Sequence, residues 1–191
     1  MHQPSKQISE NGRQTLLKVA GDSIKHGFNQ GSALEVNALD FNDELQAIRA
    51  CFVTLNRSGQ LRGCIGHLEA VMPLVEDVAD NAFSAAFRDP RFPPLSNTEF
   101  DDLVIHISVL TPSEPILFSS ESDLLNKIRP GIDGLILVDG SARGTFLPSV
   151  WESLPNPQSF LRQLKRKAGL PGDHWSENLK IYRYETESFP A

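Results

Sequence analysis

The chain has 191 residues, of which 40% are hydrophobic and 22% are charged, and its formal net charge is −6. A chain of this length can hold one good core or two small lobes packed together, and its composition is typical of a soluble globular protein. The acidic balance argues against broad electrostatic binding to nucleic acid, although a local basic patch could still provide it.

Membrane insertion and secretion are not expected. No apolar run approaches the length of a transmembrane helix, and residues 1–11 lack the apolar core of a signal peptide. Two cysteines are too few for a disulfide framework. We therefore expect a cytoplasmic protein without a membrane partner and with free thiols.

Residues 8–29 have the pattern of an amphipathic helix, because their apolar positions recur at helical spacing. Gly27 and Gly31 favour an end nearby, and residues 30–40 are expected to form a loop. Residues 1–7 are polar and are predicted to be a tail that precedes the folded part. The apolar stripe of this helix consists of Leu16, Leu17, Ala20, Ile24 and Phe28.

A β-hairpin is predicted to turn at residues 58–59, a Ser-Gly pair between two β-rich segments. Pairing the strands about this turn places Val53 opposite Cys64 and Cys51 opposite Gly66. That register does not favour a disulfide between the two cysteines.

The second strand of the hairpin, residues 61–66 (LRGCIG), contains two glycines. Glycine weakens a strand and packs nothing, so Gly63 and Gly66 indicate a bulge or a place where a ligand or another backbone comes close. Because strand side chains alternate, Arg62 and Cys64 should share one face if no bulge intervenes. The strand therefore predicts a site without revealing its reaction.

The remaining elements follow the hydrophobic periodicity. A buried helix is predicted to begin at residues 72–73 and to stop at residues 89–90, an Asp-Pro pair. Since most strands are joined by hairpins or by helices of mixed length, we expect an α+β fold with a mainly antiparallel sheet flanked by helices. The later elements are strands over residues 103–110, 135–138, 143–147 and 179–184 and helices over residues 123–128 and 158–168.

The predicted core joins the apolar helix faces to the sheet. The residues expected to be buried are Val53, Leu55, Val78, Ala82, Phe83, Ile107, Val109, Leu137 and Phe160.

Several motifs along the chain occur in the same order in one known family. They are LRGCIG at residues 61–66, preceded by FVTL at 52–55 and followed by DPRF at 89–92, ISVLT at 107–111, GIDGL at 131–135, FLP at 146–148 and KAGL at 167–170. This series resembles the AMMECR1 domain family over nearly the whole chain. The resemblance implies a single domain over residues 8–189 with an α+β fold in two unequal lobes.

The bacterial members that the chain most resembles belong to what is called the AmmeMemoRadiSam system. That association implies a Memo-like protein and a radical-SAM protein as partners. Radical-SAM chemistry would belong to the partner, because this chain lacks a three-cysteine cluster motif. The resemblance implies no established activity for the family.

Cys64 and Arg62 are the candidate catalytic residues. A nucleophilic cysteine needs a lowered pKa, which a neighbouring cation helps to provide, whereas a free cysteine in a strand is usually a small buried hydrophobe. Arg62 could bind a phosphate or a carboxylate, or it could form a structural ion pair, for which Asp89 is a candidate partner. Cys51 has no comparable setting and is expected in the core.

The candidate ligand-binding residues are Gly63, Gly66, Asp89 and Arg91. Asp89 and Arg91 lie on a loop directly after a buried helix, where functional side chains are common, but they could equally satisfy the backbone of a turn. His67 is expected on the face opposite Cys64. His106 lies among apolar residues in mid-strand, so we predict no Cys-His dyad.

No metal-binding, Walker or Rossmann motif is present in the sequence, and no cofactor is expected. Residues 162–167 carry four basic side chains, Arg162, Lys165, Arg166 and Lys167, which could contact RNA but are more typical of a solvated helix face.

Three hypotheses for the function remain open. The chain could be an enzyme that acts on or binds a nucleotide or nucleic-acid-like substrate in a cleft at residues 61–66, which rests on analogy between folds. It could instead be a non-catalytic component that docks onto the Memo-like and radical-SAM proteins. Finally, the small residues of this strand could only let a helix approach the sheet closely.

Overall fold

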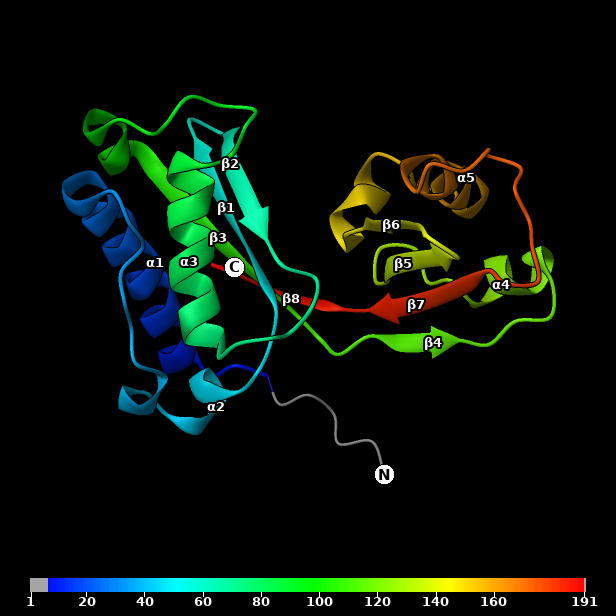
Figure 1. The fold of residues 1–191 in the computed structure, drawn as a ribbon, viewed down its shortest axis with the longest axis horizontal. Helices are drawn as coiled ribbons and strands as arrows, with labels where there is room; N and C mark the ends of the chain where they lie inside the picture. Colours follow the sequence, from blue (N-terminus) through cyan, green and yellow to red (C-terminus); the bar gives the residue numbers. More distant parts are fainter. Residues whose placement is uncertain (1–6, 191) are drawn as a thin grey trace. The chain divides into compact units, whose positions relative to one another are not determined.

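In a computed structural model, residues 7–190 are described and form two compact units (Figure 1). Of the described residues, 7–110 and 187–190 form the first unit, and Thr111–Thr186 form the second. All but one residue of the predicted tail lies outside the described part. The prediction of a single domain over residues 8–189 stays a prediction.

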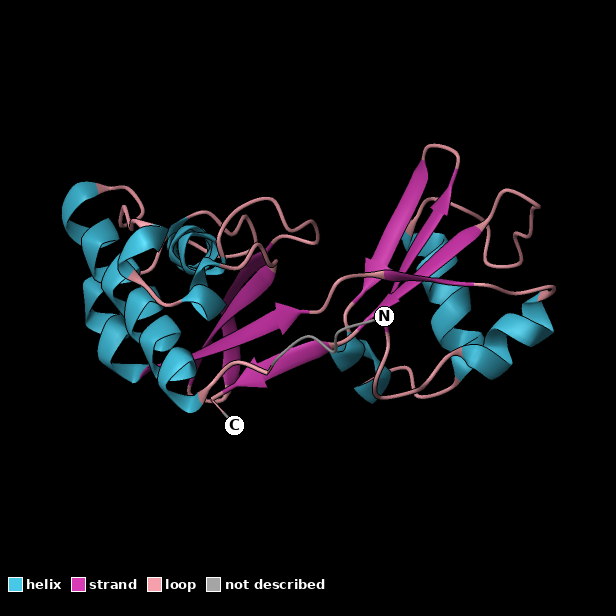
Figure 2. Ribbon diagram, turned by 90° about the horizontal axis from the view of Figure 1, so that it is seen from below, coloured by secondary structure: helices cyan, strands magenta, loops and turns pink. Residues whose placement is uncertain are grey.

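The first unit is built from two long helices on one face of a sheet (Figures 1 and 2). Helix α1 (Glu10–Gln30) begins at Ser9, whose side chain accepts a hydrogen bond from the Gly12 N–H, and ends at Gly31 in the left-handed conformation. Helix α3 (Leu74–Phe87) packs beside it. The shorter helical segments are η1 (Ala38–Asp40), α2 (Asp43–Gln46) and η2 (Asn97–Asp102).

The sheet of this unit is antiparallel at the β2–β1 and β1–β3 pairings, and its strand order is β2-β1-β3-β8. Its strands are β1 (Cys51–Arg57), β2 (Gln60–Gly66), β3 (Leu103–Leu110) and β8 (Thr186–Phe189). Alternate residues of β1 and β3 point to the helix side, where Val53, Leu55, Ile107 and Val109 are completely buried. The other face carries polar and partly exposed side chains and is called the open face below.

The second unit has its own antiparallel sheet, with strand order β4-β7-β5-β6, and its own core. Trp151 stacks on Phe160 in this core, with 3.7 Å between the ring centroids. The elements are β4 (Glu114–Ile116), α4 (Glu121–Lys127), β5 (Gly134–Asp139), β6 (Ala142–Phe146), η3 (Pro148–Glu152), α5 (Pro157–Lys167) and β7 (Lys180–Tyr184).

The α+β class is confirmed, with the strands divided between two sheets. All nine residues predicted to be buried are at most 3% exposed. The predicted hairpin register is right near the turn and wrong beyond it: Asn56 pairs with Leu61, but Thr54, and not Val53, pairs with Cys64. The shift occurs because Arg62 is an extra residue in β2, a bulge that the sequence pairing omitted.

Candidate functional site

The glycines of β2 are places where other backbone comes close. A Cβ atom on Gly63 would lie 2.1 Å from the carbonyl oxygen of Ala85 in helix α3. A Cβ atom on Gly66 would lie 2.4 Å from the carbonyl oxygen of Cys51. Gly63 therefore lets α3 pack directly on the strand, as the structural hypothesis for this motif expects.

The backbone of Cys64 is held from outside the sheet by the loop that follows α3. Its N–H donates to Asp89 Oδ2 at 2.9 Å, and its carbonyl oxygen accepts from the Arg91 guanidinium at 3.4 Å. Since β2 is an edge strand, these side chains take the place of a further strand at this point. The structure thus brings together Cys64, Asp89 and Arg91, three of the residues predicted from sequence.

Asp89 and Arg91 form a tight ion pair. Arg91 donates from Nε to Oδ1 at 3.0 Å and from a terminal nitrogen to Oδ2 at 2.7 Å. These hydrogen bonds hold the pKa of Asp89 well below its usual range, against the opposing effect of burial. Asp89 is buried, whereas the Arg91 side chain is 54% exposed, so part of its guanidinium faces solvent.

Arg62 lies in a different ion pair from the one proposed for it. Its partner is Glu99 and not Asp89, with contacts of 2.9 and 3.2 Å from Nε and a terminal nitrogen. Arg62, followed by the Ser96 N–H, lowers the pKa of Glu99 to about 2. Glu99 thus satisfies the Arg62 guanidinium, and the guanidinium that contacts Cys64, through its carbonyl oxygen, is that of Arg91.

The side chain of Cys64 belongs to a row of three residues on the open face. Register pairs Cys64 with Thr54 and Thr54 with His106, so the three residues lie side by side across β2, β1 and β3. The Cys64 Sγ atom lies 3.1 Å from Thr54 Oγ1. His106 has no ion pair or hydrogen bond from its side chain to residues 7–190. Sequence reasoning missed this row because the bulge shifts the alignment by one residue.

His67 lies in another polar cluster. Its Nδ1 atom is 2.5 Å from Oδ1 of the buried Asp77, whose other oxygen accepts from the Cys51 N–H at 3.0 Å. Burial, followed by the charge of Asp77, raises the pKa of the Cys51 thiol well above its usual value. Cys51 is completely buried and Cys64 is partly exposed, and both thiols are free.

The basic stretch on α5 is not a uniform solvated face. Arg162, Arg166 and Lys167 are exposed, but Lys165 is completely buried, with its ammonium 3.3 Å from Glu121. The placement of Lys165 on the solvated face is therefore wrong, since its ammonium pairs with Glu121 and lies 5.6 Å from the centre of the Trp175 ring.

Residues 7–190 contain no group of three or more His, Cys, Asp and Glu side chains arranged to hold a metal ion. None of the helices in this range combines the length and the apolar character needed to cross a bilayer.

The chain is similar to several archaeal and bacterial proteins. It is 39% identical over 188 residues to a protein of Methanothermobacter thermautotrophicus, covering 95% of each chain. It is 42% identical to a protein of Thermotoga maritima, covering 93% of this chain and 98% of that one. The crystal structure of an uncharacterized protein of Pyrococcus horikoshii, PH0010, has a TM-score of 0.85 at 37% identity, over 95% of this chain and 92% of that one.

A family model agrees with these similarities. The model described as AMMECR1 matches residues 17–189, which include both sheets and the loop that clamps Cys64. The chain belongs to the AMMECR1 family.

Proposed function

We propose that this protein is a thiol-dependent enzyme of the cytoplasm, where Cys64 stays reduced and acts as the nucleophile. The observation that carries the proposal is the row of Cys64, Thr54 and His106 on the open face. A partly exposed Cys64 and an imidazole without a partner among the described side chains lie on the same surface with β1 between them, although the sequence predicted no Cys-His dyad.

The proposed reaction is transfer of an acyl group. The Cys64 sulfur attacks a carbonyl carbon, a thioester forms, and the leaving group departs with the proton that the thiol gives up. Thr54 Oγ1 lies 3.1 Å from the sulfur, within hydrogen-bond distance of the thiol. We assign His106, which pairs with Thr54 in register, as the base that takes the thiol proton and returns it to the leaving group. Water then cleaves the thioester and regenerates the thiol.

The backbone clamp supports this role because it holds the nucleophile in one place. Asp89 and Arg91 fix the N–H and the carbonyl of Cys64, so its Sγ atom has little freedom apart from rotation of the side chain. Gly63 supports the same strand from below by admitting α3. Arg62 contributes indirectly, because its ion pair with Glu99 holds the bulge next to Cys64.

A negatively charged substrate is favoured at this site. Arg91 is half exposed beside Cys64 and could share its charge between Asp89 and a substrate carboxylate or phosphate. A nucleotide-like substrate remains a prediction on this basis. Titration calorimetry with ADP would test it, with Arg91→Gln expected to abolish any binding and Arg162→Gln expected to leave it unchanged.

The enzyme hypothesis is tested by acylation with p-nitrophenyl acetate. We expect release of nitrophenolate together with one acetyl group on the Cys64 peptide in mass spectra. Cys64→Ser should abolish this labelling and His106→Gln should slow it about tenfold or more, while His26→Gln, which alters a partly exposed histidine elsewhere, should have no effect. Acetylation that is equal in the His106 and His26 variants would contradict the assigned proton acceptor.

A docking role is the second candidate, because large apolar side chains are exposed around the same sheet. Leu61 is 42% exposed at the start of β2 and Val104 is 49% exposed on the open face. The Memo-like and radical-SAM proteins are the proposed partners. Binding of the purified Memo-like protein that is lost in Val104→Asp and kept in Cys64→Ser would favour docking over catalysis.

A further inference from the structure

One aromatic side chain stands beside the candidate nucleophile on the open face. Phe52 lies two residues before Thr54 on β1, and strand alternation therefore places the two side chains on the same face of the sheet. Register pairs Phe52 with Gly66 on β2 and with Ser108 on β3. These three residues form the row next to the one that contains Cys64.

The Phe52 ring leans across onto β2. A Cβ atom on Gly66 would lie 2.4 Å from Cγ and 2.5 Å from Cδ1 of this ring, so the ring covers the glycine. Gly66 follows Cys64 by two residues on the same strand, which separates their Cα atoms by about 6–7 Å. Any side chain on Gly66 would displace the ring, so this glycine keeps the ring beside the thiol.

Packing in a core does not account for the position of this ring. Phe52 belongs to neither hydrophobic core, whereas Ile65, which precedes Gly66 on β2, packs against the first. The Phe52 side chain is partly exposed, and it makes no ring–ring or cation–ring contact within residues 7–190. The part of the ring that does not cover Gly66 is therefore available to a flat apolar ligand.

We infer, on the basis of the proposed acyl transfer, that the acyl group carried by Cys64 is aromatic and that Phe52 selects it. The aryl ring of the acyl group would lie against the Phe52 ring in an offset-stacked or edge-to-face contact. The Cys64 sulfur forms a bond to the aryl carbonyl carbon, and the bond to the leaving group breaks. Water then cleaves the aryl thioester, which releases the aryl carboxylate and restores the thiol.

The charged group of the substrate belongs on the other side of the thiol. Arg91 contacts the Cys64 carbonyl oxygen from beyond the edge of the sheet, whereas Phe52 lies on the inner strand β1. The partners of Phe52 in its row, Gly66 and Ser108, carry no charge. The aromatic acyl group is therefore assigned to the Phe52 side, and a carboxylate or phosphate is assigned to the leaving group.

Two activated esters with the same leaving group test this assignment. p-Nitrophenyl benzoate carries a flat ring, and p-nitrophenyl cyclohexanecarboxylate carries a ring of the same size that is not flat. The rate of Cys64 acylation by each ester is divided by the rate of the same ester with N-acetylcysteine, which removes the intrinsic difference in reactivity. We expect the corrected rate to be about two- to tenfold higher for the benzoate, the range for one aromatic pair.

The contribution of Phe52 is tested by substitution. Phe52→Leu should abolish the preference for the benzoate and leave acetylation of Cys64 by p-nitrophenyl acetate unchanged, which also reports that the variant is folded. Phe52→Tyr, which keeps the ring, should keep the preference.

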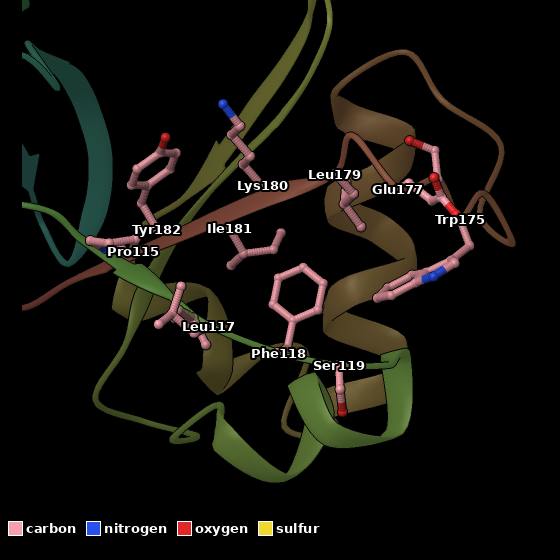
Figure 3. A pocket seen from close by; sticks show the side chains of 12 residues that line it. Pro115, Leu117, Phe118, Ser119, Trp175, Glu177, Leu179, Lys180, Ile181 and Tyr182 are labelled. Atoms are coloured by element: carbon pink, nitrogen blue, oxygen red, sulfur yellow. The ribbon is translucent and has the colours of Figure 1, made fainter.

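Phe118→Leu is the matched control. Phe118 and Trp175, with 5.5 Å between their ring centroids, line a hollow of about 550 Å³ in the second unit, which is a second aromatic surface for an aryl ester (Figure 3). This substitution should leave the preference of Cys64 for the benzoate unchanged.

Equal corrected rates for the two esters in the unaltered protein would overturn the aromatic assignment, and this comparison does not depend on the folding of any variant. A preference that survives in Phe52→Leu, or that disappears in Phe118→Leu, would overturn the role of Phe52. In these cases Cys64 is still acylated, so the proposed acyl transfer stands. If neither these esters nor p-nitrophenyl acetate acylates Cys64, the proposed function fails together with the aromatic assignment.

Discussion

At the scale of single residues, the two arginines of the candidate site differ in their ion-pair partners. Arg91 with Asp89 clamps the backbone of Cys64, and Arg62 with Glu99 holds the bulge next to it. Both guanidinium groups therefore have a structural role. Only Arg91 keeps enough exposure to contact a substrate as well, because Arg62 is 13% exposed and Arg91 is 54% exposed.

Asp89→Asn should weaken the clamp. The substitution removes the negative charge that pairs with Arg91 and leaves a single neutral acceptor for the Cys64 N–H. Because hydrogen bonds to charged groups contribute about 1.5–3 kcal/mol, we expect the free energy of unfolding to fall by that amount. Urea denaturation would measure this. Asp101→Asn, at an exposed aspartate, should change stability by less than about 0.5 kcal/mol; equal losses in the two variants would count against the clamp.

The ion pair of Glu99 predicts that the free energy of unfolding depends on pH in the acid range. The pKa of Glu99 is lowered from 4.5 to about 2 in the folded chain, so its ionised form stabilises the fold above its unfolded pKa. That stabilisation is lost as the pH falls from about 4.5 toward 2. In Glu99→Gln the free energy of unfolding should be lower near neutral pH and should depend less on pH across this window. An unchanged pH dependence in equilibrium unfolding would show that Glu99 is not the group responsible.

The residues of the candidate site were only partly predictable. The LRGCIG and DPRF motifs predicted Cys64, Asp89 and Arg91, and these residues do meet. Their pairings were not predictable, because Glu99 belongs to no matched motif and reaches Arg62 through the fold. Thr54 could not be predicted from the sequence either, because only the pairing register of β1 and β2 places it beside the thiol.

At the scale of elements, the close approach of α3 to β2 depends on Gly63. Gly63→Ala would bring Cβ to 2.1 Å from a backbone oxygen, which cannot move aside cheaply, so the strand or the helix must shift. We expect a loss of about 1–3 kcal/mol in the free energy of unfolding, as for other overpacked sites.

Gly21→Ala is the matched control for this substitution. A Cβ atom there would lie 3.9 Å from its nearest neighbours, and alanine favours a helix interior over glycine. The control should leave thermal stability unchanged or raise it. If Gly63→Ala is as stable as Gly21→Ala, the contact between strand and helix is looser than described.

Sequence patterns predicted most elements but not their arrangement. Helices α1, α3 and α5 and strands β1, β3 and β5 have long apolar patterns and were predicted close to their observed bounds. Strands β4 and β8 were missed because they span three and four residues, and β4 contains a proline. The bulge at Arg62 was missed because a bulge is a feature of pairing between strands.

At the scale of the whole molecule, the chain crosses between the two units twice, after Leu110 and before Glu187. Each unit has a separate core, represented by Phe83 and Phe160, both at most 3% exposed. The predicted single domain requires that these cores unfold together. Phe83→Ala and Phe160→Ala should each lower the free energy of unfolding by about 3–5 kcal/mol. Each should shift the midpoint of the same single transition in urea denaturation. Two transitions, each moved by only one substitution, would make the units independent domains.

We propose that Cys64 is a nucleophilic thiol on an accessible surface, and native-state alkylation tests this proposal most directly. Iodoacetamide should label Cys64 in the folded protein well before Cys51, which is completely buried with a raised thiol pKa. Peptide mass spectrometry over time would give the two rates. Labelling of Cys51 only after denaturation, with Cys64 modified early, is the result we predict. If Cys64 also reacts only after denaturation, the motif is a packing element and the proposed nucleophile is wrong.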